Sequence, residues 1–303
     1  MVAGVGALTA RRRKDLALDA AQRALRLRNE MGIGLQAPAP VFDIIDKLGI
    51  ELRFWPIPSL EGVYRAQPSP VIPISSDRPP GRQVYTGAHE LGHHVYGHGV
   101  AVDEASENAA QEGPASADPE EYLADRFAGF FLMPATAVKH GFRTRGWEPK
   151  ECTPRQVYAV ASWLGVGYTT LVHHMRGSLG MLTYQRSAQL LKATPKDIRA
   201  GILGRDVQEN LFVVGEKWTD RAVDMQVGDL LMLPPGTLHE AANLRVVERT
   251  GSAMLLTATA PGIGRVYRPE SDWAAFVRVS RRSYVGRGAY RHWEDPDHGT
   301  EDD

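Results

Sequence analysis

The chain contains an H-E-x-x-H pentapeptide, from His89 to His93, inside an apolar-rich run between Tyr85 and Val95. One helix can span this run, and because a helix turns once in 3.6 residues, side chains four positions apart lie nearly above one another. His89 and His93 can therefore place two imidazoles on one metal ion, with Glu90 beside them. This spacing is the signature of zinc peptidases, although two histidines on a surface helix would give the same letters.

A catalytic zinc site needs a third protein ligand and leaves a fourth position to water. The metzincin continuation requires a glycine and a histidine after the pentapeptide, but Tyr96 and Gly99 occupy those positions, which excludes that class. His94 and His98 lie well round the helix from the face of His89 and His93, so we expect them to be exposed or capping residues rather than ligands.

A second amphipathic helix is predicted after Asp118, which can cap its start, and Pro134 ends the run. Glu121 and Asp125 lie four positions apart on it and so share one face, as in zinc peptidases whose third ligand is a glutamate. There the glutamate binds zinc and the aspartate accepts the free ring N–H of a ligand histidine, which fixes its tautomer. Glu120 is the alternative ligand. A solvated acidic face is the simpler interpretation of these carboxylates.

Two separated motifs give the chain a resemblance to a known family. The segments from Arg82 to His94 and from Glu121 to Pro134, the latter ending in Phe-Leu-Met-Pro, are similar to the F-T-x-A-H-E-L-G-H and E-x-E-A-[ND]-x-F-A-x-x-L-L-M-P patterns of the ImmA/IrrE metallopeptidases. Tyr85, Gly87 and Leu123 depart from these patterns without removing a proposed ligand. The similarity extends over roughly residues 15 to 180. It includes a first helix, a short helix at 40–49, a strand at 51–55, and the stretch 61–64 before 70–75.

This resemblance implies a Zn²⁺ cofactor and a protein substrate, specifically a helix-turn-helix transcriptional repressor. It implies His89, His93 and Glu121 as metal ligands, Glu90 as general base, and Asp125 as the partner of a ligand histidine. In such a mechanism Glu90 takes a proton from the attacking water and later protonates the leaving amine. Tyr64 and Tyr85 are candidates for stabilising the oxyanion by side-chain type alone.

The composition is typical of an intracellular enzyme. Cys152 is the only cysteine in 303 residues, so no intramolecular disulfide can form and we expect a cytoplasmic protein in which this thiol is incidental. A net charge of −1 gives no overall attraction to nucleic acid. No apolar run approaches the length of a membrane span, so we expect no membrane partner. The oligomeric state is left open.

Between the two predicted helices, residues 101–118 are rich in Ala, Ser, Glu and Asp, and we expect a flexible excursion over the site. After a linker at 143–153, Pro154 to Met175 follows the helix-turn-helix pattern, with Gly165 in the turn. The predicted second helix, from Tyr168 to Met175, contains no Lys or Arg. Packing or protein docking is therefore favoured over DNA recognition.

From about Asn210, short β-rich runs separated by Gly and Pro predict a mainly β domain. The runs are 211–214, 230–233, 245–248, 253–259, 265–267 and 276–280. Part of this region matches the second half of the cupin signature, through Gly228, Pro234, Gly236, His239 and Asn243. The first half, with its paired histidines and glutamate, is missing, and Asp224 alone does not replace it, so we expect a strand, a turn and a strand.

We therefore predict an α+β protein in four parts: a zincin-like metallopeptidase core (1–142), a linker with a helix-turn-helix-like module (143–185), a mainly β domain that senses a signal or binds a partner (186–292), and a disordered acidic tail (293–303). The predicted function is that of a zinc-dependent endopeptidase acting on a regulatory protein. The alternative is a non-enzymatic regulator with a structural zinc site, which binds DNA or protein through the later regions. The presence of Glu90 favours the endopeptidase over this alternative, because a structural zinc site would not require a general base.

Overall fold

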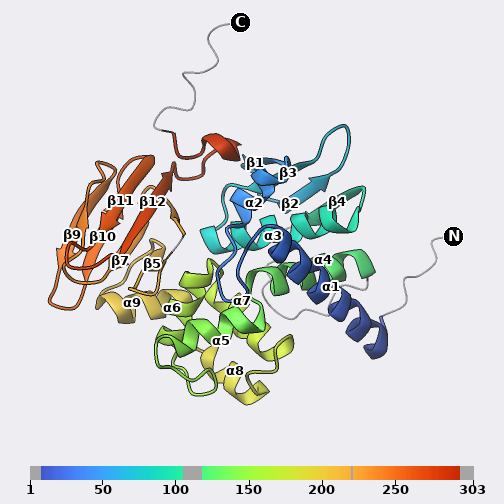
Figure 1. Ribbon diagram of the computed structural model, residues 1–303, viewed down its shortest axis with the longest axis horizontal. Helices are drawn as coiled ribbons and strands as arrows, with labels where there is room; N and C mark the ends of the chain where they lie inside the picture. Colours follow the sequence, from blue (N-terminus) through green and yellow to red (C-terminus); the bar gives the residue numbers. More distant parts are fainter. Residues whose placement is uncertain (1–7, 105–117, 220, 294–303) are drawn as a thin grey trace, which may run out of the picture.

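A computed structural model describes residues 8–104, 118–219 and 221–293 and shows a mixed α+β protein (Figure 1). An N-terminal α+β core, a helical region and a mainly β region follow one another along the chain. One cluster of buried apolar residues runs through all three, from Ala20 to Tyr284. The predicted α+β class is therefore confirmed. No helix in these described ranges is long and apolar enough to cross a membrane.

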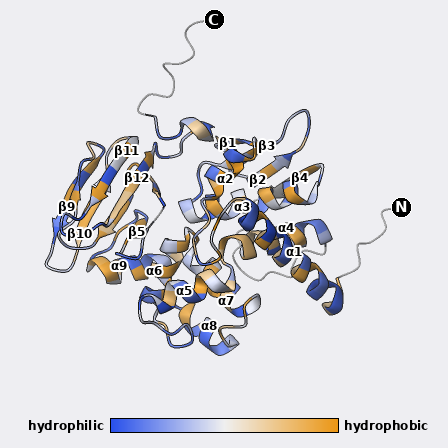
Figure 2. Ribbon diagram, in the orientation of Figure 1, coloured by the Kyte–Doolittle hydropathy of each residue, from blue (hydrophilic) through white to orange (hydrophobic). Residues whose placement is uncertain are grey.

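The N-terminal core is a mixed sheet with helices packed on it. Its elements are α1 (Ala10–Glu30), α2 (Val41–Lys47), β1 (Glu51–Trp55), β2 (Leu60–Arg65), β3 (Val71–Ser75), α3 (Pro80–Tyr96), β4 (Val100–Glu104) and α4 (Pro119–Leu132). A last strand, β13 (Gly286–Arg287), joins from near the C-terminus, and the order is β13-β1-β3-β2-β4. All five residues of the central strand β3 are buried, whereas α1 is largely hydrophilic along its length (Figure 2).

The two helices that carry the motifs have clear sequence signals at their ends. Pro80 lies in the first turn of α3, and Gly97, with a φ of 72°, ends the helix in the left-handed conformation that favours glycine. Asp118 caps α4 as expected, because its side chain accepts a hydrogen bond from the backbone N–H of Glu120 at 2.9 Å. The helices approach closely: a Cβ atom at Gly92 would stand 3.0 Å from the Cα of Ala124.

The first residues of the expected flexible excursion are a strand. Val100–Glu104 forms strand β4, which pairs antiparallel with β2 and occupies the edge of the sheet. The expectation of a loop from residue 101 was wrong because strand pairing supplies the backbone hydrogen bonds that the local composition did not indicate. The rest of that segment, residues 105–117, lies outside the described residues, as does the predicted tail at 294–303.

The helical region contains α5 (Ala135–Arg143), α6 (Pro154–Leu164), α7 (Tyr168–Gly177), α8 (Tyr184–Leu190) and α9 (Pro195–Leu203). Helices α6 and α7 form the expected helix-turn-helix pair, with left-handed Gly165 ending α6. The helical region runs on past residue 185 because Thr183 and Thr194 cap two further helices. His174 on α7 ties this region to the core, since its Nε2 lies 3.0 Å from the carbonyl oxygen of Met133.

The mainly β region contains two four-stranded sheets, of order β5-β7-β10-β9 and β6-β12-β11-β8. Their strands are β5 (Leu211–Val213), β6 (Val223–Gln226), β7 (Leu230–Leu233), β8 (Leu238–His239), β9 (Leu244–Arg249), β10 (Met254–Ala258), β11 (Gly262–Tyr267) and β12 (Ala274–Ser280). Each of the six predicted runs overlaps a strand. The strand, turn and strand expected between Gly228 and Asn243 are present as β7, a turn and β8. The short strands β6 and β13 were not predicted, because two to four residues carry too little periodicity to be recognised.

Candidate metal centre

Three predicted ligands lie together between α3 and α4. The Nε2 atoms of His89 and His93 are 3.1 Å apart. The Glu121 carboxylate lies across from them, 3.2 Å from His89 Nε2 and 3.5 Å from His93 Nε2. These atoms form the group that could hold a metal ion among the described residues. The helical spacing in α3 and the close approach of α4 together produce the cluster.

The spacing of the donor atoms fits a small divalent ion. In a tetrahedral zinc site, bonds of about 2.0–2.1 Å place neighbouring donor atoms about 3.3 Å apart. The three distances in the cluster, 3.1, 3.2 and 3.5 Å, agree with that value. Two imidazole nitrogens and one carboxylate are also a donor set that zinc accepts at catalytic sites. The cluster is therefore compatible with a metal site that leaves a fourth position open.

Burial makes the site asymmetric. His93 and Glu90 are almost completely buried, whereas the Glu121 side chain is 30% exposed. The open side of the cluster therefore lies towards Glu121. Glu90 is enclosed between α3 and β2, because a Cβ atom at Gly62 would stand only 2.8 Å from its Oε1. A glycine at position 62 thus provides the space in which the Glu90 carboxylate lies.

The electrostatics of Glu121 reflect its two histidine neighbours. Burial alone would raise the pKa of this carboxyl group, but hydrogen bonds and charge interactions with His89 and His93 outweigh burial and hold the pKa well below its usual range. Glu121 therefore stays ionised. A metal cation requires a deprotonated carboxylate as its ligand, and the Glu121 oxygens lie close to two imidazole nitrogens that could bind the same ion.

Asp125 lies one turn after Glu121 on α4, where it accepts a hydrogen bond from a tyrosine. The hydroxyl of Tyr85 donates to Asp125 Oδ1 at 2.7 Å. Asp125 is also 3.8 Å from the guanidinium of Arg126. Tyr85, considered above for the oxyanion, thus joins α3 to α4 beside the cluster. The predicted bond from a ligand histidine to Asp125 stays a prediction.

His94 and His98, which follow the pentapeptide, each lie within hydrogen-bond distance of another side chain, which was not expected. His98 Nδ1 lies 2.8 Å from His93 Nδ1, so one ring shares a proton with the other. His94 Nδ1 lies 3.0 Å from the hydroxyl of Tyr64, the other tyrosine considered for the oxyanion. Both histidines are half-buried and lie outside the metal-binding group. Half-burial contradicts the expectation that they are exposed, whereas the alternative that they cap the helix remains, and their exclusion as ligands stays a prediction.

The position of His98 follows from the end of α3. Left-handed Gly97 reverses the chain, and the backbone N–H of His98 then bonds to the carbonyl oxygen of His93 at 3.0 Å. The His98 ring stacks on Tyr96, with centroids 5.6 Å apart, and the Tyr96 hydroxyl donates to Asp19 of α1 at 2.7 Å. A glycine directly after the helix was the sequence signal that could have predicted this return.

The remaining candidate residues have structural partners. Cys152 is buried, and burial raises the pKa of its thiol to about 11, so the thiol stays protonated. His239, in the cupin-like stretch, lies 3.3 Å from the carbonyl oxygen of Ala241 through its Nδ1. Asp224 is bound by Arg278 at 2.6 Å. Within the described ranges, none of the three belongs to a metal-binding group.

The fold and the site together are typical of one class of protein. An α+β domain with the motif His89, Glu90 and His93 on one helix, and Glu121 on a second helix, has the residues of a metallopeptidase. Residues 45–176 match the model of the Peptidase_M78 family, described as the IrrE N-terminal-like domain. This domain, which covers less than half of the chain, is similar to the ImmA/IrrE family. The resemblance seen in the two motifs is therefore confirmed.

Other comparisons add little. No curated protein matches the chain in sequence. A solved structure described as a Mycobacterium tuberculosis transcriptional regulator is similar over 54% of this chain and 46% of that chain, with 16% identity and a TM-score of 0.35. The chain thus spans less than half of that structure's length, and a similarity of this size defines neither fold nor function.

Proposed function

We propose that the chain is a zinc-dependent endopeptidase with a zincin-like core, which hydrolyses a peptide bond in a helix-turn-helix transcriptional repressor. The observation that carries the proposal is the cluster of His89, His93 and Glu121, with Glu90 on the same helix turn. When bound there, zinc would supply a Lewis acid for the scissile carbonyl and lower the pKa of the attacking water.

The residues of the chain have separate roles in this reaction. His89, His93 and Glu121 hold the metal, and their distances require little rearrangement to do so. Glu90 accepts a proton from the attacking water and returns it to the amine that leaves. Its enclosure beside Gly62 limits the directions that the carboxylate can take. His98 orients the ring of His93 through their shared proton.

The experiment uses a matched set of variants and the DNA-binding regulators encoded beside this chain as substrates. Glu90→Gln should retain bound zinc but lose cleavage, because the amide cannot accept a proton. Glu121→Gln should lose zinc affinity. Glu120→Gln is the control on the same helix turn and should keep both properties. Cleavage that persists in the Glu90→Gln protein would overturn the assignment of the general base.

The non-enzymatic alternative receives little support from α7. Tyr168, Leu171, Val172, His174 and Met175 on this helix are buried, so few of its side chains could reach a DNA groove. The first cation, Arg176, lies over the ring of Tyr184 at 5.4 Å. We therefore propose that the helix pair is a packing or protein-docking element. DNA binding that depends on salt and survives removal of zinc would support the alternative instead.

We place the proposed activity in the cytoplasm, in a regulatory pathway that responds to stress. A single buried cysteine without a disulfide is typical of a reducing compartment. Tagging the chain and following it by cell fractionation together with its substrate would test this location. Recovery of the protein outside the cytoplasm would contradict it.

A further inference from the structure

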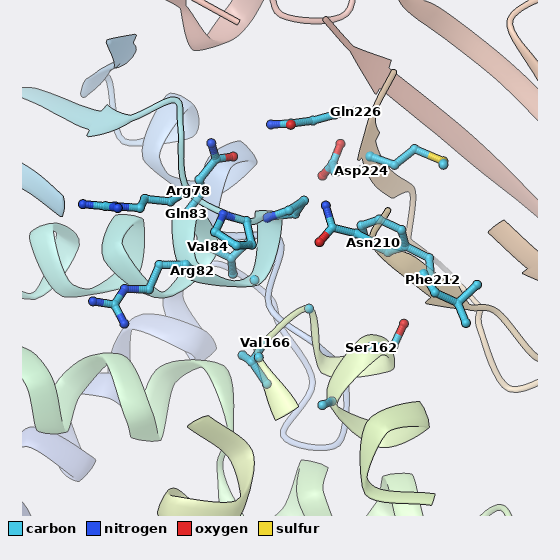
Figure 3. Close-up of a pocket in the computed structure, with 18 of the residues that line it drawn as sticks. Arg78, Arg82, Gln83, Val84, Ser162, Val166, Asn210, Phe212, Asp224 and Gln226 are labelled. Atoms are coloured by element: carbon cyan, nitrogen blue, oxygen red, sulfur yellow. The ribbon is translucent and has the colours of Figure 1, made fainter. Parts of the chain in front are cut away.

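A cavity of about 620 Å³ lies where the three regions meet (Figure 3). Its walls are the first turns of α3, the end of α6 with the start of α7, and the strands β5 and β6 of the β region. This volume falls in the range of sites that enclose a small organic molecule. The cavity is distinct from the metal cluster, since Val84, its last lining residue on α3, precedes His89 by five positions.

The charges around the cavity are unbalanced. Arg78 and Arg82 point away from Asn210 and Gln226 (Figure 3), and both bind Glu61. The remaining ionisable lining residues comprise three guanidinium groups and one carboxylate, with one histidine. They are Arg199, Arg221, Arg291, Asp224 and His292. The cavity therefore has an excess of positive charge.

The single carboxylate among these groups is already compensated. Arg278 binds Asp224 through two nitrogen atoms, each at 2.6 Å, and His292 Nε2 lies 3.4 Å from its Oδ1. Arg291 is 8% exposed and donates through Nη1 to the carbonyl oxygen of Gly288 at 2.7 Å. Its Nη2 makes no hydrogen bond to any described residue, although the carboxylates of Asp224 and Asp43 lie within ion-pair distance, at 3.7 and 3.9 Å. A buried cationic donor is thus available at the cavity wall.

The start of α7 adds favourable potential for an anion. Its N-cap is Gly167, which has no side chain to cap the first turn, and that turn contains no acidic residue. The first turn of α3 is close by, because a Cβ atom at Gly81 would stand 2.8 Å from the backbone nitrogen of Gly167. Both helix starts line the cavity. Uncapped N–H groups and two helix dipoles favour a negative group there.

The rest of the wall suits a flat apolar group. Phe212, Trp218 and Met225 line the side formed by the β region, and Tyr158 lines the side of α6. Polar residues are interspersed with them, including Asn210 and Gln226, which point inwards beside Asp224 (Figure 3). An apolar wall with a few fixed polar groups is the usual composition of a small-molecule site.

We propose that this junction cavity binds a small organic anion with a planar apolar body. Its acidic group lies near the start of α7 and the arginines, and its body lies against the aromatic side chains of the β region. The ligand contacts the core, the helix pair and the β region at once. The proposal concerns binding alone, so it is tested independently of peptidase activity.

Three probes of matched shape separate the possibilities: 1-naphthyl phosphate, 1-naphthoate and the uncharged 1-naphthol. Titration calorimetry on the full-length chain should give a Kd of about 1 mM or tighter for at least one anion. Binding should weaken at high salt, and 1-naphthol should bind about tenfold more weakly or not at all. The stronger of the two anions identifies a phosphate or a carboxylate as the preferred acidic group.

Thr169→Glu tests the position of the acidic group. Thr169 is half-buried in the first turn of α7 and lines the cavity. A carboxylate there suits the helix dipole, so the variant should fold, yet it should repel an anionic ligand. Thr169→Gln is the control of equal size. We expect binding of the anion to fall about tenfold or more in Thr169→Glu, and less in Thr169→Gln.

Arg199→Gln provides a second test on a different wall, and Arg155→Gln, an exposed residue outside the cavity, is its control. The first variant should weaken anion binding and the second should not. Three results would overturn the proposal: binding of 1-naphthol as strong as that of both anions, no binding of either anion at millimolar concentration, or unchanged anion binding in both Thr169→Glu and Arg199→Gln.

Discussion

Replacing Gly92 by alanine should separate α3 from α4 and weaken the metal site. The new Cβ atom would stand 3.0 Å from Ala124 Cα and 3.2 Å from the Ala124 carbonyl oxygen. Carbon atoms in contact prefer about 3.5–4.0 Å, so the helices must move apart by about 0.5 Å or more. Both neighbouring atoms belong to the backbone, which cannot turn away as a side chain can. Glu121 lies one turn before Ala124 and would move with it.

The expected magnitude follows from that displacement. Metal–ligand distances tolerate changes of about 0.2 Å, so a shift of about 0.5 Å should lower zinc affinity by roughly 10- to 100-fold. The overpacked contact should cost about 1–3 kcal/mol of unfolding free energy, partly offset by about 1 kcal/mol from the better helix propensity of alanine. Gly201→Ala on α9 is the control, since its Cβ would meet nothing within 4 Å.

The assays are competition with a chromophoric zinc chelator and denaturant unfolding of the metal-free protein. Gly201→Ala should bind zinc normally and unfold at higher denaturant concentration. Gly92→Ala should bind zinc more weakly, and its unfolding free energy should lie about 1–3 kcal/mol below that of the control. If both variants bind zinc equally well and are equally stable, the close approach of α3 and α4 does not determine the site.

Three further outcomes are expected. His98→Ala should lower zinc affinity about tenfold, because His93 loses the group that fixes its tautomer, whereas His94→Ala should change it less; equal effects in the chelator assay would contradict this. Adding zinc at 100 times its Kd should stabilise the fold by about 2.7 kcal/mol, seen as a rise in Tm that chelator reverses and that Glu121→Gln lacks. Burial lowers the pKa of His174 to about 4, whereas the pKa in the unfolded chain is about 6.5. Because the unfolded state therefore binds the proton first, the free energy of unfolding should fall by about 3 kcal/mol as the pH drops from about 6.5 to 4. Denaturant unfolding across that range should give a flatter profile for His174→Gln, and an unchanged profile would contradict the assignment.

Local patterns were sufficient to predict the helices that carry the site. Each of these signals lies within a single segment: the spacing of His89 and His93, and the cap at Asp118. The structure shows both, since the two histidines lie on α3 and Asp118 caps α4. Glu121 could be proposed because four-residue spacing with Asp125 gives two carboxylates one face. The approach of α4 to α3 at Gly92 is a tertiary contact, yet a glycine inside the pentapeptide is consistent with it.

Contacts between distant segments could not be predicted in this way. The return of His98 to His93, five residues earlier, is a local exception, because a glycine directly after the helix, Gly97, could have indicated it. Strand β4 exists because β2 presents a free edge, although its own composition indicates a loop. The junction cavity draws its walls from three regions, so no motif in one segment could indicate it.

The pairing of β13 with β1 has a consequence for protein synthesis. Gly286 and Arg287 pair with Phe54 and Arg53, so the edge of the N-terminal sheet is completed by residues more than 230 positions later. At about 5–20 residues per second, a ribosome needs on the order of 10 to 50 s to make that intervening chain. During that interval β1 presents unpaired backbone groups, and an exposed strand edge readily pairs with other chains. The nascent chain therefore depends on β13, or on a chaperone, to protect the sheet beside the candidate metal centre.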